Sequence, residues 1–176
     1  MLEHQDFIGK YEESLEEIEL SINTYSLPLR IEDLVGIYEP RFSPEHKGEF
    51  APAIDFAVAD PRVRETEVLA PCDGVVFAGR LANTRWGEGR EFVKFLNWIN
   101  IRTDNNEFFE LAHIAPISRR ILRVGDRVKR GEVIAVAGLN GRMTVTDGKV
   151  DSHIHMLVGR EKPNGFTGLR VRWADL

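Results

Sequence analysis

The chain has 176 residues, about the length of one domain, and its 43% hydrophobic and 29% charged residues are typical of a globular protein. A formal net charge of −5 argues against nucleic acid or an anionic membrane surface as a partner, because both require clustered cations. Cys72 is the only cysteine, which excludes an intrachain disulfide and a cysteine-based zinc site, so any metal must be bound by histidines and carboxylates.

The N-terminal residues 1–6 lack the basic start and the apolar run of a secretory signal. The sequence contains no stretch of roughly 20 apolar residues, so it predicts no membrane-spanning helix. We therefore expect a cytoplasmic protein as the sequence stands, or an extracytoplasmic one if a leader was removed.

The first predicted element is an amphipathic helix, because apolar residues recur at spacings of three and four with glutamates between them. The apolar stripe comprises Ile8, Tyr11, Leu15, Ile18 and Ile22. It is too short for a free coiled coil, so we expect it to dock on the main domain or to pair with a second copy in a homodimer. The helix and the connector after it form a predicted N-terminal unit of residues 1–42.

The remaining residues, 43–176, are predicted to form one mainly β domain. Short runs rich in β-branched and aromatic residues alternate with Gly, Pro, Asn and Asp turns. The predicted strands include Glu67–Leu69, Gly74–Ala78, Phe92–Phe95, Trp98–Arg102 and Phe108–Ala112. No long helix fits after residue 50, residues 115–122 fit at most a single helical turn, and the tail from residue 162 fits a loop and a terminal strand.

The strongest local indication of chemistry is the pair His153 and His155 in an apolar, β-branched setting. Residues i and i+2 of a strand face the same side, so both rings point to one surface. Such a pair can share a metal ion, or one ring can bind metal while the other transfers protons. The simpler alternative is a pair of hydrogen-bonded or solvent-facing histidines.

Three further residues are candidate ligands or proton carriers: His46, Asp55 and His113. Asp55 lies between Ile54 and Phe56, where an ionised carboxylate is costly unless it is paired or bound to metal. Taken alone, Asp55 is explained slightly better as a turn cap or a salt-bridge partner.

Taken in order, these motifs resemble the lysostaphin-type peptidoglycan endopeptidases. That family has an early His and Asp, a Tyr-Ala-His-Leu-like tetrapeptide, a Val-x-x-Gly-Asp-x-Val-x-x-Gly turn block and a late His-Leu-His-Phe. The corresponding segments here are His46 to Asp55, Leu111-Ala112-His113-Ile114, Val124 to Gly131, and His153-Ile154-His155-Met156. The resemblance covers roughly residues 43 to 160, and the shared order is more specific than any single motif.

The resemblance implies a fold, a cofactor and a function. The fold would be an antiparallel β-sandwich or barrel-sandwich hybrid of the duplicated type, preceded by the N-terminal helix. His46, Asp55 and His155 would ligate Zn2+, and His113 and His153 would be the catalytic pair. The implied activity is that of a zinc-dependent endopeptidase that hydrolyses peptide bonds of peptidoglycan through a metal-activated water.

The early motif departs from the common family spacing, in which the histidine stands four residues before the aspartate. Ala51 occupies that position, and His46 stands nine residues before Asp55, as in a longer variant that resembles this sequence. Asp151 and Ser152 replace the small pair that usually precedes the late histidines, and the loop over residues 141–149 is longer than usual.

Three other classes of protein share part of the pattern. Biotinyl and lipoyl carriers share the turn blocks and the run from Leu69 to Val76, but no Met-Lys-Met-like hairpin is present to carry a modified lysine. Cupins also place His-x-His on a β-barrel, but Glu161 does not have the spacing of their next ligand. A catalytically inactive family member that binds or regulates a partner is the most serious alternative, although five intact candidate residues argue against it.

Overall fold

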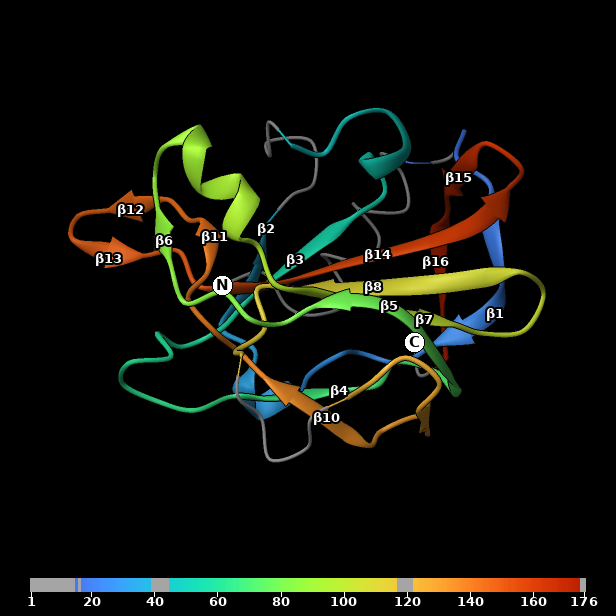
Figure 1. The fold of residues 1–176 in the computed structure, drawn as a ribbon, viewed down its shortest axis with the longest axis horizontal. Helices are drawn as coiled ribbons and strands as arrows, with labels where there is room; N and C mark the ends of the chain where they lie inside the picture. The colour runs from blue at the N-terminus through green and yellow to red at the C-terminus, as the bar shows by residue number, and fades with distance from the viewer. Residues whose placement is uncertain (1–14, 16, 39–44, 117–121, 175–176) are drawn as a thin grey trace.

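The computed structural model describes residues 15, 17–38, 45–116 and 122–174 (Figure 1). The strands are β1 Leu20–Tyr25, β2 Gly36–Tyr38, β3 Ile54–Ala57, β4 Glu67–Leu69, β5 Gly74–Arg80, β6 Trp86–Gly87, β7 Trp98–Arg102, β8 Glu107–Ala112, β9 Arg127–Val128, β10 Val133–Val136, β11 Gly141–Arg142, β12 Val145–Thr146, β13 Lys149–Val150, β14 His153–Lys162, β15 Gly165–Gly168 and β16 Arg170–Trp173. The described helices are the short 3-10 turns η1 Ile31–Asp33, η3 Gly48–Phe50 and η4 Arg90–Phe95. None of these described helices has the length and apolarity needed to cross a membrane.

One large antiparallel sheet organises the fold, with strand order β2-β3-β14-β8-β7-β5-β9 and with β15 added beside β14. The long strand β14 pairs with β3 on one side and with β8 on the other. Of the four two-stranded sheets among the described residues, the antiparallel pair β4–β10 and the parallel pair β1–β16 lie beside the large sheet (Figure 1), and the other two are the parallel pair β6–β11 and the antiparallel pair β12–β13. The described strands therefore form open antiparallel and parallel sheets, and the large sheet does not close into a barrel.

The pleat of the large sheet separates a buried face from an accessible one. Ile154, Met156 and Val158 of β14 are fully buried in the main hydrophobic core. Residues of β1, β16, β4 and β10 belong to the same core, which therefore lies between the large sheet and the two small ones. Because side chains alternate along a strand, His153 and His155 of β14 point to the opposite face.

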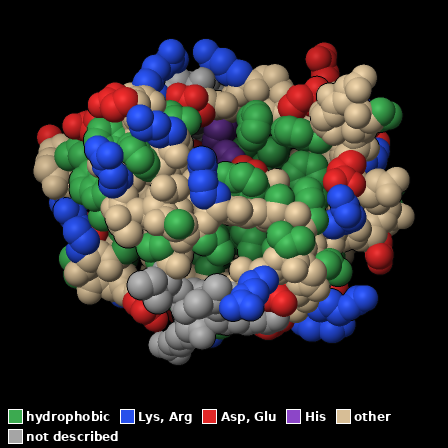
Figure 2. Space-filling view, viewed as in Figure 1, with side chains coloured by type: hydrophobic (Ala, Val, Ile, Leu, Met, Phe, Trp, Pro, Cys, Tyr) green, Lys and Arg blue, Asp and Glu red, His purple; other side chains and the backbone are tan. Residues whose placement is uncertain are grey.

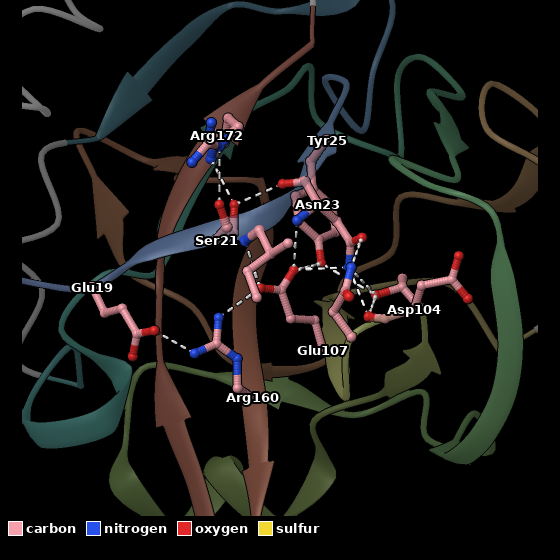
Figure 3. A network of polar contacts seen from close by, with 11 residues as sticks. Glu19, Ser21, Asn23, Tyr25, Asp104, Glu107, Arg160 and Arg172 are labelled. Atoms are coloured by element: carbon pink, nitrogen blue, oxygen red, sulfur yellow. Dashed lines mark hydrogen bonds and ion pairs between the residues drawn. The ribbon is translucent and has the colours of Figure 1, made fainter.

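A buried carboxylate joins β1 to the large sheet (Figure 3). Glu107 at the start of β8 is fully buried and accepts hydrogen bonds from the backbone N–H groups of Ile22 (2.7 Å) and Asn23 (3.1 Å). It also accepts hydrogen bonds from the Asn23 amide (2.9 Å), the Tyr25 hydroxyl (3.1 Å) and the Arg160 guanidinium (3.0 Å). The register of β1 against β16 shifts at this point, so Glu107 satisfies backbone donors at the irregular part of the strand pair.

The predicted N-terminal helix is wrong over its last part. Leu20–Tyr25 is the strand β1, and Ile22, which was assigned to the apolar stripe, is 56% exposed. The strand depends on pairing with β16 at the other end of the chain, which local periodicity does not reveal. Residues 8–14 of the predicted helix lie outside the described residues, as does the predicted boundary at residue 42, so docking or dimerisation through this helix stays a prediction.

Four of the five predicted strands named above are confirmed as β4, β5, β7 and β8, and the predicted terminal strand is β16, preceded by β15. The prediction of a strand at Phe92–Phe95 is wrong, because these residues form the end of η4. Residues three apart lie on the same side of a 3-10 helix, and the rings of Phe92 and Phe95 pack with centroids 6.1 Å apart. Of the turn predicted at 115–122, residues 117–121 lie outside the described residues.

Candidate metal centre

Strand pairing brings His155 and Asp55 together on the accessible face of the large sheet. In the antiparallel pair β14–β3, His155 lies directly opposite Asp55, and cross-strand partners point to the same face. His153 lies two residues earlier on β14 and shares that face, as the i and i+2 spacing predicts. The antiparallel register therefore builds one side of the site.

His46, from the segment before η3, completes a cluster of three metal-ligand side chains. Its Nε2 atom lies 3.2 Å from Nδ1 of His155 and 3.4 Å from Oδ2 of Asp55. The Nδ1 atom of His155 lies 2.9 Å from Oδ1 of Asp55. Two ligand atoms at about 2.0–2.1 Å from a tetrahedral ion are separated by about 3.3 Å, so the donor types and their spacing fit Zn2+.

Contacts on both sides of His46 hold its segment in place. Glu45 forms an ion pair with Arg142 of β11, with 2.8 Å between Oε1 and Nη1. On the other side, Oε2 of Glu49 accepts a hydrogen bond from the backbone N–H of Gly168 in β15 (3.0 Å). The segment that places the ligand nine residues before the aspartate is therefore anchored to two separate strands.

The cluster has a consistent electrostatic pattern. Burial disfavours the Asp55 carboxylate, but hydrogen bonds with His155 and His46 outweigh this effect and hold the pKa of Asp55 well below its ordinary value. Burial also lowers the pKa of His155, while the hydrogen bond and charge of Asp55 raise it, and the net pKa is raised. Asp55 is therefore ionised at neutral pH, which is the form in which a carboxylate binds a metal.

His113 and His153 lie beside this cluster, with ring centroids 4.4 Å apart. The Nδ1 atom of His153 donates to the carbonyl of Asp151 (2.8 Å), and the Nδ1 atom of His113 donates to the carbonyl of Asn140 (2.9 Å). Because a carbonyl oxygen only accepts, Nδ1 carries the proton in both rings, and in the neutral form Nε2 is the acceptor. The Nε2 atom of His153 lies 3.9 Å from Oδ1 of Asp55.

Burial lowers the pKa of His113 well below its ordinary value, and the charge of His153 acts in the same direction. The neutral imidazole is therefore the stable form of His113 at neutral pH. The structure brings all five predicted site residues together, with His46, Asp55 and His155 as one group and His113 and His153 as the other. Their roles as ligands and catalytic residues remain predictions.

The histidines lie at the bottom of a hollow (Figure 2), with hydrophobic and charged side chains around its rim. The side chains of His153 and His155 are 14% and 13% exposed, whereas that of His46 is 2% exposed. The two histidines of β14 are therefore partly accessible to solvent, whereas His46 is almost completely buried.

Tyr38 belongs to this site but was not predicted. It lies opposite Asp55 in the pair β2–β3, and its ring stands perpendicular to that of His153 with centroids 6.1 Å apart. Burial raises the pKa of the Tyr38 hydroxyl. No sequence signal marks Tyr38, because its position depends on the pairing of β2 with β3.

Glu110 is a second residue on this face that was not predicted. Glu110 lies two residues before Ala112, and Ala112 lies opposite His155. The side chain of Glu110 therefore points to the same face as that of His155. Burial raises the pKa of Glu110, and the charge of His155 opposes this shift. The sequence does carry a signal for Glu110, because it is the one acidic residue in the otherwise apolar run Phe108–Ala112.

Residues 49–164 match the family described as Peptidase family M23. The matched span includes Asp55, His113, His153 and His155 and begins shortly after His46, so the place of His46 in the cluster rests on the geometry given above. No curated protein matches the chain.

Several solved structures are similar to this chain. Three of them are a zinc-containing peptidase from Vibrio cholerae (21% identity, TM-score 0.52), the M23 metalloprotease pseudoalterin from the deep sea (13%, 0.54) and a putative glycyl-glycine endopeptidase lytM from Ruminococcus gnavus (19%, 0.53). The similarity covers 88%, 85% and 94% of this chain and 41%, 75% and 64% of those chains, respectively. The chain thus spans less than half of the Vibrio protein, and at these identities the likeness shows a shared fold.

Proposed function

This chain belongs to peptidase family M23, and on that premise we propose that it is a zinc-dependent endopeptidase that hydrolyses peptide bonds of peptidoglycan. Members of the family are zinc metallopeptidases, so the lysostaphin-type resemblance and the predicted cofactor Zn2+ are confirmed. The family supports a metallopeptidase that acts on peptidoglycan. The activity of this chain and its residue roles are the parts that we propose.

One observation carries the proposal: His46, Asp55 and His155 converge, with their ligand atoms within 4.8 Å of one another, next to a second pair of histidines. A purely structural site would not need His113 and His153 beside the three ligands with an acceptor nitrogen left on each ring. Three protein ligands with an open fourth position are typical of catalytic rather than structural zinc sites.

In this mechanism His46, Asp55 and His155 would hold the ion, because Nε2 of His46, Nδ1 of His155 and the Asp55 carboxylate are the atoms that converge. When bound, Zn2+ supplies a Lewis acid that polarises the scissile carbonyl and lowers the pKa of water to about 7. The ionised state of Asp55 gives the three ligands a net negative charge to offset the charge of the ion.

His113 and His153 supply proton transfer. Each ring is fixed at Nδ1 by a backbone carbonyl, so each neutral ring accepts a proton at Nε2. A ring that has accepted the proton of the attacking water becomes the acid that donates it to the leaving amine. The low pKa of His113 favours return of that proton, because its charged form is disfavoured by burial.

The proposed substrate requires action outside the cytoplasm, since peptidoglycan peptides are cell-wall components. We therefore propose an extracytoplasmic site of action. The open hollow at the histidines fits an extended peptide that lies across the sheet face with its scissile bond at the cluster (Figure 2).

The proposal is tested by metal content and by release of amino groups from purified peptidoglycan. We expect about one zinc per chain in the wild type and in His113→Gln and His153→Gln, and activity in the wild type alone among these three. His155→Ala should lose both zinc and activity. His4→Ala is the matched control, because His4 is the one histidine that the proposed mechanism does not use, and it should retain both.

The outcomes separate the alternatives. A zinc-loaded wild type that releases no amino groups contradicts the proposed endopeptidase and favours an inactive family member that binds a partner. A wild type that takes up no zinc, even when the ion is offered after dialysis, contradicts the assignment of the three ligands.

A further inference from the structure

The backbone at His113 has a conformation that its surroundings must impose. Its φ is +59°, in the left-handed region that residues other than glycine rarely adopt. His113 directly follows β8, where the chain leaves the large sheet. Conformations of this kind persist where neighbouring groups determine them, and they are frequent at functional sites.

Three hydrogen bonds from two segments, one at Asn97 and one over residues 138–140, hold His113. Its backbone N–H donates to the carbonyl of Asn97 (3.0 Å), and its own carbonyl accepts from the N–H of Gly138 (2.8 Å). Its ring Nδ1 donates to the carbonyl of Asn140 (2.9 Å). The main chain and the imidazole are therefore fixed separately.

The two asparagines in this set are fully buried and are bonded to each other. The backbone N–H of Asn97 donates to Oδ1 of Asn140 (2.7 Å). Both side-chain amides donate to the carbonyl of Ile114, from Asn97 at 3.0 Å and from Asn140 at 2.8 Å. Asn97 also exchanges two bonds of 2.9 Å with the backbone of Asn83, so the side-chain polar atoms of the pair all have partners.

The glycines around the pair show how tightly these segments approach one another. A Cβ atom at Gly138 would lie 2.6 Å from the Cα atom of Ala115, which no side chain allows. At Gly141, next to Asn140, φ is +76°, and a Cβ atom would lie 3.0 Å from the side chain of Leu96. Side chains are therefore absent at two places where the segment that carries Asn140 passes close to its neighbours.

Burying two amides requires removing them from water, and apolar side chains would fill the same space without that cost. A fully hydrogen-bonded polar network, unlike an apolar one, fixes a single geometry. The geometry fixed here is that of the segment from His113 to Ile114.

We propose that Asn97 and Asn140 are positioning residues that hold the His113 imidazole as its Nδ1–H tautomer, which leaves Nε2 as the acceptor. The inference rests on the proposed function, in which His113 transfers a proton at Nε2. Neither asparagine touches the metal cluster in the described contacts, so the pair acts through His113 and not through the ion.

The expected effect of loosening the pair is specific. In Asn140→Ala the backbone N–H of Asn97 and the carbonyl of Ile114 each lose a partner, and the carbonyl that accepts from His113 is no longer fixed by the side chain of its own residue. A displacement of about 1 Å at a catalytic group costs about 100-fold in rate, so we expect kcat to fall by about 10- to 100-fold. Substrate binding and zinc content should not change, because neither depends on the His113 tautomer.

The test uses the zinc-loaded protein and two readouts. Nitrogen-15 NMR of the histidine rings reports which nitrogen of His113 carries the proton, and kinetics on a soluble cross-linked muropeptide separate kcat from KM. Asn140→Ser is the milder variant, because its hydroxyl can still accept from Asn97. Asn23→Ala is the matched control. The Asn23 amide donates to Asp104 and Glu107 where β1 meets the large sheet, and among the described residues it has no bond to His113.

We expect a single Nδ1–H tautomer in the wild type and in Asn23→Ala, a mixture of tautomers in Asn140→Ala, and an intermediate loss of kcat in Asn140→Ser. The inference is overturned if the wild type carries the proton on Nε2, if Asn140→Ala keeps the wild-type tautomer, or if Asn23→Ala lowers kcat as much as Asn140→Ala. If the wild type has no peptidase activity, the proposed function fails, and the NMR readout still decides whether the pair positions His113.

Discussion

Glu107 offers a sharp test of how the fold is held together, because one buried carboxylate joins β1 to the large sheet. Replacing it by glutamine keeps the size of the side chain and exchanges one acceptor oxygen for an NH2 donor. Oε1 accepts from the backbone of Ile22 and from Arg160, and Oε2 accepts from Asn23 and Tyr25. Whichever way the amide is turned, its NH2 group faces donors that have lost their acceptor.

The magnitude follows from the number of donors affected. Each buried donor left without a partner costs about 1–3 kcal/mol, and at least two are affected, so Glu107→Gln should lower the free energy of unfolding by about 3 kcal/mol. That is a large part of the roughly 5–15 kcal/mol that stabilises a typical domain. For a chain of this size it corresponds to a fall in Tm of roughly 6–12 °C.

Urea and thermal unfolding, followed by circular dichroism on zinc-loaded protein, measure this change. Glu161→Gln is the control, because Glu161 forms an exposed ion pair with Arg102 (2.7 Å) and should lose less than about 1 kcal/mol. Zinc content should stay at the wild-type level in both variants, since Glu107 bonds to residues of β1 and to Arg160 and not to the three proposed ligands. A loss in Glu107→Gln no larger than that in the control would refute the reasoning that Glu107 satisfies otherwise unpaired donors.

Three other predictions concern the metal, the pH dependence and the core. A chelator should lower the Tm of the wild type but not that of His155→Ala, because an ion that binds only the folded state stabilises it; equal shifts would contradict the assigned site. Burial lowers the pKa of His113 in the folded protein below the value of about 6.5 in the unfolded chain. The contribution of His113 to stability is therefore complete above a pH of about 6.5 and is lost as the pH falls toward the folded-state pKa, because only the unfolded chain then takes up the proton. The stability advantage of the metal-free wild type over His113→Gln should therefore shrink between about pH 7 and 5, by up to about 1.4 kcal/mol per unit, and an advantage that grows would reverse the assigned sign. Phe109→Ala should lower the free energy of unfolding by about 3–5 kcal/mol in the same urea assay, because Phe109 is fully buried and its ring packs edge-on against Tyr25; a loss under about 1 kcal/mol would place Phe109 outside the core.

Local sequence determined the strands that carry the site. The alternation of apolar and polar residues in β14 places His153 and His155 on one face and Ile154 on the other, and this follows from the period of a β-strand alone. The Gly, Pro, Asn and Asp turns likewise indicated where β4, β5, β7 and β8 lie, to within two residues at each end. The order of the five candidate residues was also readable, because motif order is a property of the chain itself.

The wrong predictions from the sequence concern segments whose structure depends on contacts with other residues, some of them far away in the chain. The periodicity through Ile22 predicted a helix, but β16 and Glu107 provide the partners that make Leu20–Tyr25 a strand. Phe92–Phe95 has strand propensity, yet it forms a 3-10 helix in which Phe92 and Phe95 pack against each other. Propensity is a weak prior that such contacts override.

The site itself was only partly contained in the sequence. Residue types identified His46, Asp55 and His155 as candidates, but only the antiparallel register of β14 against β3 sets His155 opposite Asp55. Nothing in the chain's order indicated that Asn97 and Asn140 meet beneath His113, since their bond joins the segments before β7 and β11. Sequence supplied the chemistry of the side chains, and tertiary structure decided their distances, because those distances depend on strand pairing and buried hydrogen bonds between residues far apart in the chain.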